Sequence, residues 1–415
     1  MLALLLVLLA ETPPRRRHGG RRMIADGADL EDFPARAATK KEAADSGATL
    51  EQAQSMPWHA VHNTSCDGRR CRPGEGNLKG YKMWGQPYVH RESWVQSKAR
   101  RMPHMPDPSN YAEAVRVAHS VKRHNLVIFC AGDFDYRDIV LNWYLHVNGR
   151  LGYKNAMVVA MDHELHEEMR QRHIPSVDNQ ANLDEWNATC LQRHIQRVRM
   201  ERQLVLAALV ASGLDVLHTD ATVAIVRDVL PTLSSPPLAD VDFIVQREGG
   251  PSGAVKRIGA AVNTGFILVR AAKPDATKRF FVDMVRRGLV EFYNRWNNVV
   301  DQMGWSFLVA DTSDLAKSPT SQLANESTIT ALGRYGLRLA FLPYDQFPRI
   351  GSWAALKPTA AIWHLTPDGS LGKQYEAPDG VPPFRGHRQR LDRYDEVDFE
   401  AHVAVMRQIG LWLVP

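Results

Sequence analysis

The chain has 415 residues, of which 44% are hydrophobic and 23% charged, so it can bury a full core and is not disordered as a whole. Its net charge is +5, but the first 124 residues carry 20 Lys and Arg against 13 Asp and Glu. The basic excess therefore lies near the N-terminus. The rest of the chain has no charge excess typical of nucleic-acid binding, and we do not expect nucleic acid as a partner.

The N-terminal residues 1–10, MLALLLVLLA, are almost purely apolar but too short to span a bilayer, which takes about 20 residues. Their length is that of a signal-peptide core; a truncated membrane anchor and an apolar tail are the alternatives. If the segment is an anchor, the basic run RRRHGGRR after it would place the bulk of the chain in the cytosol. Three glycosylation sequons, at Asn63, Asn187 and Asn325, favour a lumenal location weakly.

Composition divides the chain into four parts. After residues 1–10, residues 11–55 are rich in Arg, Ala, Asp and Gly without a sustained period, which is typical of a disordered basic stem. Residues 56–123 hold several aromatic residues among Pro and Gly and predict an irregular collar. A regular pattern begins at residue 124, and residues 124–415 are predicted to form one domain.

The first half of this domain alternates strands and helices. Apolar runs predict buried strands at 126–132 (LVIFCAG), 155–162 (NAMVVAMD) and 215–219 (DVLHT). Helices are expected after Asp135 as a cap, over 165–173 before Pro175, and over 190–212, with Gly213 as the residue that ends the last one. Such alternation predicts an α/β fold with a sheet that is parallel in its first half and covered by helices on both faces.

The second half is more mixed. Strands are predicted at 241–246, 260–270, in LRLAFLPYDQF and in AIWHL, and helices at 275–296, from 301 onwards and at 397–412. The predicted fold class is therefore an α/β protein with a mixed, Rossmann-like sheet flanked by helices.

Ligands of such sheets bind at the carboxyl ends of the strands. Ala131 and Gly132, Asp162 and Asp220 are all expected there. Asp220 supplies a hard oxygen ligand for Mg²⁺ or Mn²⁺, and Thr222 stands where a second carboxylate would complete a metal clamp. The alternative is that Asp220 only caps a turn.

Three further stretches carry polar groups that suit a phosphorylated ligand. In the predicted strand, Asn263, Thr264 and Gly265 place an amide, a hydroxyl and a glycine together, either for close approach of a ligand or as a bulge. Asp301 and Gln302 stand at a helix start, where capping alone would explain the Asp. His364 at a strand end and Lys373 in the following loop would grip a diphosphate together, although a lone His is more often structural.

The order of these stretches resembles the nucleotide-diphospho-sugar transferase family. VIFCAG, GLDVLHTDATVAIVRD, NTGFILVRA, DQ, LPYDQFPRIG and WHLTPDGSLGK follow one another over roughly residues 124–376, and NTGFILVR is the most specific of them. The resemblance is to GT-A glycosyltransferases that include plant and algal cell-wall arabinosyl-, xylosyl- and galactosyltransferases. It implies a GT-A fold, a nucleotide-sugar donor (here UDP-sugar), a glycan or glycoprotein acceptor, Mn²⁺ or Mg²⁺, a retaining reaction and a Golgi location as a type II membrane protein.

The resemblance also implies site residues. The family's Asp-x-Asp motif falls on Asp220, Ala221 and Thr222, so the second carboxylate is missing. The other family positions match Asn263, the Asp301 and Gln302 pair, His364, Lys373 and, in the preceding helix, Arg202.

From these matches we expect a division of roles. Ala131 and Gly132 bound the nucleoside slot, while Arg202, Thr264, Gly265 and Lys373 contact the donor. Asp220, Thr222 and His364 hold the metal. The catalytic residues are expected to be Asn263, Asp301 and Gln302, which orient the sugar and the acceptor.

Two other functions compete with the transferase. The Thr at position 222 motivates the first alternative, a catalytically weak or inactive relative that binds sugar nucleotides or glycans. A Rossmann oxidoreductase or methyltransferase is disfavoured, because FCAGDFDY follows the first strand where GxGxxG would be required.

Overall fold

The structure, a computed structural model, describes residues 102–188, 194–249, 252–291, 300–315, 326–349, 358–364, 402–403, 406–407 and 409–414. The predicted N-terminal segments 1–10 and 11–55, most of the collar and Lys373 lie outside the described residues. Among the helices described, none is long and apolar enough to cross a membrane.

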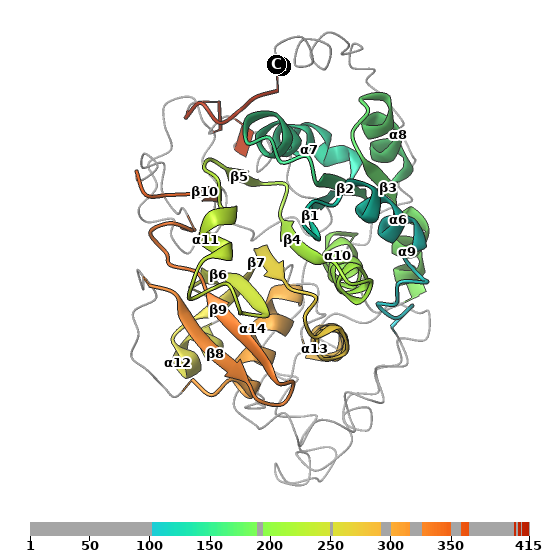
Figure 1. The fold of residues 1–415 in the computed structure, drawn as a ribbon. Helices are drawn as coiled ribbons and strands as arrows, with labels where there is room; N and C mark the ends of the chain where they lie inside the picture. Colours follow the sequence, from blue (N-terminus) through green and yellow to red (C-terminus); the bar gives the residue numbers. More distant parts are fainter. Residues whose placement is uncertain are drawn as a thin grey trace, which may run out of the picture.

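A mixed eight-stranded sheet has the order β3-β2-β1-β4-β7-β6-β9-β8 (Figure 1). Its strands are β1 Leu126–Gly132, β2 Ala156–Ala160, β3 Ser176–Asp178, β4 Asp215–Thr219, β6 Phe243–Glu248, β7 Ala261–Val269, β8 Thr328–Leu332 and β9 Leu337–Phe341. Strands β3, β2, β1 and β4 pair in parallel, whereas β7 is antiparallel to both of its neighbours. The predicted mixed α/β sheet, parallel in its first half, is confirmed.

Helices cover both faces of the sheet. They are α6 Ala112–Val121, α7 Arg137–Tyr144, α8 His163–Gln171, α9 Gln180–Glu185, α10 His194–Ala211, α11 Leu230–Ser234, α12 Ser252–Ile258, α13 Pro274–Glu291 and α14 Val300–Thr312, with a π-helical turn at Leu145–Arg150. Helix layers are needed on both faces because the apolar side chains of a buried strand point alternately to one face and the other. Strand β1 shows this alternation. Val127 and Phe129 belong to the core that includes α10 and α13, and Ile128 and Cys130 to the core that includes α7.

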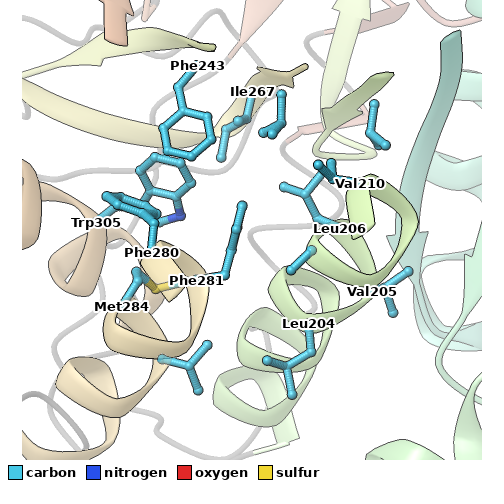
Figure 2. Close-up of a cluster of buried hydrophobic side chains, with 14 of the residues drawn as sticks. Leu204, Val205, Leu206, Val210, Phe243, Ile267, Phe280, Phe281, Met284 and Trp305 are labelled. Atoms are coloured by element: carbon cyan, nitrogen blue, oxygen red, sulfur yellow. The ribbon is translucent and has the colours of Figure 1, made fainter. Parts of the chain in front are cut away.

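Aromatic side chains fill the larger core and fix α10 in place. The rings of Phe280 and Trp305 lie 4.6 Å apart between centroids, and Phe243 packs edge-on against Phe280 at 4.9 Å. Leu206 and Val210 of α10 face this group across the core (Figure 2). Because such cores are packed as densely as organic crystals, the polar residues that α10 carries hold fixed positions.

Two predicted features of the first half need correction. Asp135 does not cap a helix: it lies inside a 3-10 turn, and α7 begins at Arg137 with no side-chain cap. Asp162 lies just after the end of β2, as predicted, but its carboxylate caps α8. Its carboxylate accepts hydrogen bonds from Leu165 N at 2.8 Å and Phe134 N at 2.8 Å, which occupy both oxygens. A structural role therefore explains this carboxylate.

Several short elements are absent from the sequence prediction. Strands β3 and β8 were not predicted: β3 has only three residues, and β8 (TITAL) has the length of a strand but was overlooked. Helix α6 lies where an irregular collar was expected, and Tyr111 and Ala118 belong to the main core. Residues 402–403 and 406–407 of the predicted 397–412 helix are helical.

A second, two-stranded sheet joins β5 Val223–Ile225 to β10 Ile362–His364. The strands are antiparallel, and His364 pairs with Val223. Ala224 and Trp363 pack with Met406 and Leu411 near the C-terminus. This small sheet brings His364 next to the turn that follows β4.

Candidate functional site

Segments from distant parts of the chain meet at the carboxyl end of β4. Asp220 directly follows this strand. Because β7 runs antiparallel to β4, the first residues of β7 lie beside the last residues of β4, and the Asp220 N–H donates to the Gly265 carbonyl at 2.8 Å. The pairing of β10 with β5 adds His364 to the same place. The structure thus gathers Asp220, Gly265 and His364, three of the residues predicted for the site.

Gly265 marks the point where the polar side chains converge. A Cβ atom at this position would lie 2.4 Å from His364 Cε1, 2.6 Å from Asp220 Oδ2 and 2.9 Å from Asn263 Oδ1. Contacts of this length are forbidden, so the site has no room for any side chain at position 265. Close approach of functional groups is therefore the physical reason for the glycine in this strand.

The NTGF stretch also forms the bulge that was its alternative explanation. Pairing of β6 with β7 passes from Val245–Ile267 to Gln246–Asn263, so residues 264–266 have no counterpart on β6. The Asn263 side chain accepts a hydrogen bond from Gly265 N at 2.8 Å and donates to Glu248 Oε2 at 2.8 Å. Its Nδ2 also lies 3.5 Å from Gln302 Oε1. The bulge and the site are the same feature.

Arg202 of α10 connects two carboxylates at the floor of the site. Its guanidinium pairs with Asp220 Oδ1, donates to Asp301 Oδ2 at 2.6 Å and donates to Thr264 Oγ1 at 3.0 Å. Asp301 is fully buried, and Gln203 also donates to it, at 3.3 Å. Arg202 thus pairs with a fully buried carboxylate, Asp301, and with a partly exposed one, Asp220. Asp301 therefore anchors the Arg202 guanidinium in the site and does not only cap its helix.

The orientation of His364 follows from its neighbours. Gln246 donates its side-chain amide to Phe347 O at 3.2 Å and to Pro348 O at 2.9 Å, which leaves its Oε1 as an acceptor. His364 Nδ1, 2.8 Å from that oxygen, must then carry the proton. The unprotonated Nε2 faces Asp220 Oδ2 at 3.8 Å. A carboxylate oxygen and an unprotonated imidazole nitrogen, both potential metal ligands, thus face each other across the site.

Burial and charge set the protonation states. Burial opposes ionisation of Asp220, but Arg202 and the neighbouring His218 and His364 hold the pKa of its carboxyl well below the usual range. Burial, reinforced by Arg349, holds the pKa of His364 well below its usual value, and burial lowers the pKa of His218 as well. At neutral pH the site therefore contains an ionised carboxylate and neutral imidazoles, the forms that bind cations.

The donor set suits a divalent cation that is shared with a ligand. Within the described ranges, no group of three or more His, Cys, Asp and Glu side chains forms a metal site by itself. Asp220 Oδ2 and His364 Nε2 supply two ligands at a mutual distance that fits one ion. Mg²⁺ and related ions commonly take one or two carboxylates and complete their shell with water and substrate phosphates. Thr222, half-buried in the turn after Asp220, stays a predicted ligand, and Lys373 lies outside the described residues.

The end of β1 holds a second polar group. Gly132 is required by packing, because a Cβ atom there would lie 2.7 Å from Val140 of α7. Ala131 is half-buried beside it. Asp133 is next in the chain. Its buried Oδ1 accepts no hydrogen bond from the described residues, while its Oδ2 lies 2.9 Å from His194 Nε2 at the start of α10. An unsatisfied buried carboxylate oxygen is costly in the free protein and available to a ligand donor.

Three site residues were missed by the sequence analysis. Gln246 and Glu248 end β6, and His218 lies in β4 with its Nε2 3.8 Å from Asp220 Oδ1. Glu248 Oε2 also accepts from Arg349 Nε at 2.9 Å. Gln246 and Glu248 lie near a strand end, which is a signal for a ligand site, but the bulge of β7 opposite Gln246 is not visible in the sequence.

Comparison with known proteins gives a family but no close relative. No curated protein matches the chain. Among solved structures, galactosyltransferase LgtC in complex with donor and acceptor sugar analogues matches at 16% identity over 35% of this chain and 58% of its own, with a TM-score of 0.27. An active-site mutant of LgtC matches at 16% identity over 44% of this chain and 70% of its own, with a TM-score of 0.32. The bifunctional glycosyltransferase WbbM matches at 10% identity over 58% of this chain and 45% of its own, with a TM-score of 0.35.

The similarity to LgtC in complex with its analogues thus spans little more than half of that chain, and matches at this level carry no information on substrates. The family comparison is stronger. The model of the nucleotide-diphospho-sugar transferase family matches residues 152–366, just over half of the chain, and this range includes β4, β7, α14 and β10. The chain belongs to the nucleotide-diphospho-sugar transferase family, and its mixed sheet with helices on both faces has the GT-A fold expected from the sequence.

Proposed function

We propose that the protein transfers a sugar from a UDP-sugar donor to a hydroxyl group of a glycan or glycoprotein acceptor. The observation that carries the proposal is the convergence of Asp220, His364 and Asn263 around Gly265. This convergence combines an ionised carboxylate, a neutral imidazole lone pair and an oriented amide where no side chain of residue 265 intrudes. Family membership supplies the reaction class.

The leaving diphosphate must be neutralised for transfer to occur. In this proposal Asp220 and His364, with Thr222, hold Mn²⁺ or Mg²⁺, and Lys373 supplies a further positive charge. The ion would provide electrostatic stabilisation of the developing charge on the diphosphate. Asp133, with its free carboxylate oxygen beside Ala131 and Gly132, would accept a hydrogen bond from the nucleobase.

Transfer breaks the bond between the sugar C1 and the diphosphate oxygen and forms a bond from C1 to the acceptor oxygen. Two carboxylates near the site are already occupied: Glu248 accepts from Asn263 and Arg349, and Asp301 pairs with Arg202. In this proposal both carboxylates position neighbouring groups and neither attacks C1, although Asp301 Oδ1 has no hydrogen-bond partner among the described residues. We therefore propose a retaining transfer in which a departing phosphate oxygen takes the acceptor proton, while Asn263 and Gln302 orient the sugar. A covalent sugar adduct on Asp301 or Glu248 would contradict this mechanism.

Release of UDP from a panel of UDP-sugars tests the function directly. The full-length protein is incubated with each donor, with Mn²⁺ or with chelator, and UDP is quantified. We expect metal-dependent release from at least one donor and a loss of roughly a hundredfold or more in Asp220→Asn. Asp240→Asn is the matched control, because Asp240 is exposed and outside the site. No UDP release and no UDP binding in the presence of Mn²⁺ would refute the proposal.

A second candidate function is binding of sugar nucleotides with little turnover. It is favoured by Thr222 and by the ion pair of Arg202 with Asp220, which already neutralises the carboxylate that a metal would use. Thr222→Asp separates the two functions. A large gain in metal-dependent turnover would indicate a site weakened by the missing carboxylate, whereas unchanged turnover would indicate that Asp220 and His364 suffice.

We also propose that the protein works in the lumen of the secretory pathway, held by its N-terminus as a type II membrane protein. The sequon residue Asn187 is exposed, as a glycosylated Asn must be. Expression in a eukaryotic secretory host followed by glycosidase digestion tests this. A shift in mass that is lost in Asn187→Gln supports a lumenal location, and an unglycosylated product contradicts it.

A further inference from the structure

A cavity of about 470 Å³ opens at the opposite edge of the sheet from the proposed transfer site. Its lining includes Leu126, the first residue of β1, Asp215, the first residue of β4, and Asn155, which directly precedes β2. The proposed transfer site lies at the other ends of the same parallel strands. At about 3.3 Å per residue, strands of this length separate the two places by roughly 15–20 Å.

The rim of this cavity is cationic. Arg123, Lys154 and Arg270 line it, against Asp215 as the acidic lining residue. Within the described part of the chain, the Arg123 side chain forms no ion pair or hydrogen bond, and Lys154 donates only to the neutral Asn148, at 2.8 Å to Oδ1. No carboxylate of the described residues therefore pairs with either of these two cations.

Arg270 is held in place but is not satisfied. Its Nη2 donates to Leu233 O at 2.8 Å, and its Nη1 lies 3.7 Å from Asp215 Oδ2. Its Nε is buried and has no hydrogen-bond partner among the described residues. A buried guanidinium N–H without an acceptor is unfavourable unless a ligand or water supplies one.

A tight turn shapes one wall. His124 and Asn125 have φ values of 48° and 63°, the left-handed region that residues other than Gly seldom adopt. The turn is fixed to the loop before β4, because Asn125 Nδ2 donates to Gly213 O at 2.7 Å and Asp215 N donates to Asn125 O at 2.9 Å. Paired backbone hydrogen bonds between Arg123 and Leu126 close this turn, so its left-handed residues hold a fixed conformation. The His124 side chain, which lines the cavity, forms no hydrogen bond within the described residues.

The floor of the cavity is apolar and rigid. Leu126, Leu230, Leu233 and Leu268 contribute to it together with Tyr153. The Tyr153 hydroxyl pairs with Asp228 and accepts from Val229 N at 3.1 Å, so the ring has a fixed orientation. An apolar floor with an aromatic ring below a cationic rim matches a ring that has apolar C–H faces and an acidic substituent.

We propose that this cavity is a second, non-catalytic site that binds an acidic sugar residue, in which a carboxylate or a phosphate contacts Arg123, Lys154 and Arg270 and the sugar ring lies on the apolar floor. The source is either a free sugar phosphate or a uronate residue of an acidic glycan. The inference does not depend on the proposed transferase reaction, because it concerns binding in the absence of a donor.

Calorimetric titration of the full-length protein tests the site. The probes are glucuronate, a glucuronate-containing oligosaccharide, glucose 1-phosphate and inorganic phosphate, each without UDP and without metal. We expect at least one of the acidic sugars to bind more tightly than inorganic phosphate, because only they reach both the rim and the floor. Tighter binding of the oligosaccharide than of glucose 1-phosphate indicates that the natural ligand is part of a glycan. Tighter binding of glucose 1-phosphate indicates a free sugar phosphate.

Charge-removing variants on the rim decide whether binding occurs at this cavity. The Arg123→Gln and Lys154→Gln double variant is expected to weaken acidic-sugar binding at least tenfold and to leave UDP binding unchanged. Lys122→Gln is the matched control, because it removes an exposed positive charge one residue away from the lining residue Arg123. Equal affinities in the double variant and the wild type, absence of acidic-sugar binding at millimolar concentration, or equal binding of inorganic phosphate would each overturn the proposal.

Discussion

Replacement of Gly265 by Ala tests the geometry of the site with a single methyl group. The new Cβ would meet His364 Cε1 at 2.4 Å, Asp220 Oδ2 at 2.6 Å and Asn263 Oδ1 at 2.9 Å. All three contacts are shorter than real Cβ contacts, and they come from three different segments of the chain. Relief therefore requires that at least one of these side chains moves away from the point where they converge.

The size of the effect follows from the same contacts. Position 265 lies in a fully buried central strand, and an extra methyl group in such a place costs about 1–3 kcal/mol of unfolding free energy. Displacement of His364 or Asp220 additionally removes the pair of ligands that face each other at 3.8 Å. Loss of one such electrostatic contact corresponds to roughly a hundredfold or more in donor affinity or turnover.

Two assays separate these effects. Urea unfolding gives the change in stability, and titration with UDP and Mn²⁺ at a temperature where the variant is folded gives the change in affinity. Gly333→Ala is the matched control, because a Cβ atom there meets nothing within 4 Å and its backbone is not left-handed. The control is expected to stay within about 0.5 kcal/mol of wild type. Gly265→Ala with wild-type stability and wild-type UDP affinity would refute the geometric account.

Two further predictions concern charge. Arg202→Gln leaves the carboxylates of Asp220 and Asp301 without their shared cation, and we expect the unfolding free energy to fall by about 3–5 kcal/mol. Mn²⁺ should recover part of this loss. Calorimetric scans with and without Mn²⁺ measure the effect, and an unchanged melting temperature would contradict it. Burial lowers the pKa of His402 to about 4, below its usual 6.5. Between these two pH values the folded protein keeps this imidazole neutral, whereas the unfolded chain binds a proton on it, so acid favours unfolding. The contribution of neutral His402 to the unfolding free energy is complete above pH 6.5. It falls as the pH drops from 6.5 toward 4, by about 3 kcal/mol at most. Urea midpoints between pH 7 and 4 should therefore fall less steeply in His402→Gln than in wild type, and equal slopes would argue against this origin.

Local sequence patterns predicted the elements that depend on local information. The apolar run 126–132 is β1 at the same residues, and Gly213 ends α10 in the left-handed conformation, with φ of 91°. The parallel first half of the sheet and the helices on both of its faces followed from the alternation of elements, whereas the strand order was not predicted. Strands β3 and β5 have three residues each, and their existence depends on neighbours rather than on their own pattern.

The site was predictable only as a set of residues, not as an arrangement. Asp220 and Asn263 were identified from their positions, but the pairing of Arg202 with Asp220 and Asp301 depends on how α10 packs against the sheet. The protonation of His364 depends on Gln246, which is 118 residues away in the chain. Long-range contacts of this kind carry no signal in a single sequence.

The central claim is that Asp220 and His364 form a metal-assisted site for the diphosphate of a UDP-sugar. Calorimetric titration of the full-length protein with UDP, in the presence of Mn²⁺ and in the presence of chelator, tests it most directly, with Asp220→Asn as the variant and Asp240→Asn as the control. We predict UDP binding that requires Mn²⁺, is lost in Asp220→Asn and is unchanged in Asp240→Asn. UDP binding of equal strength with and without Mn²⁺, or no UDP binding under either condition, would contradict the account.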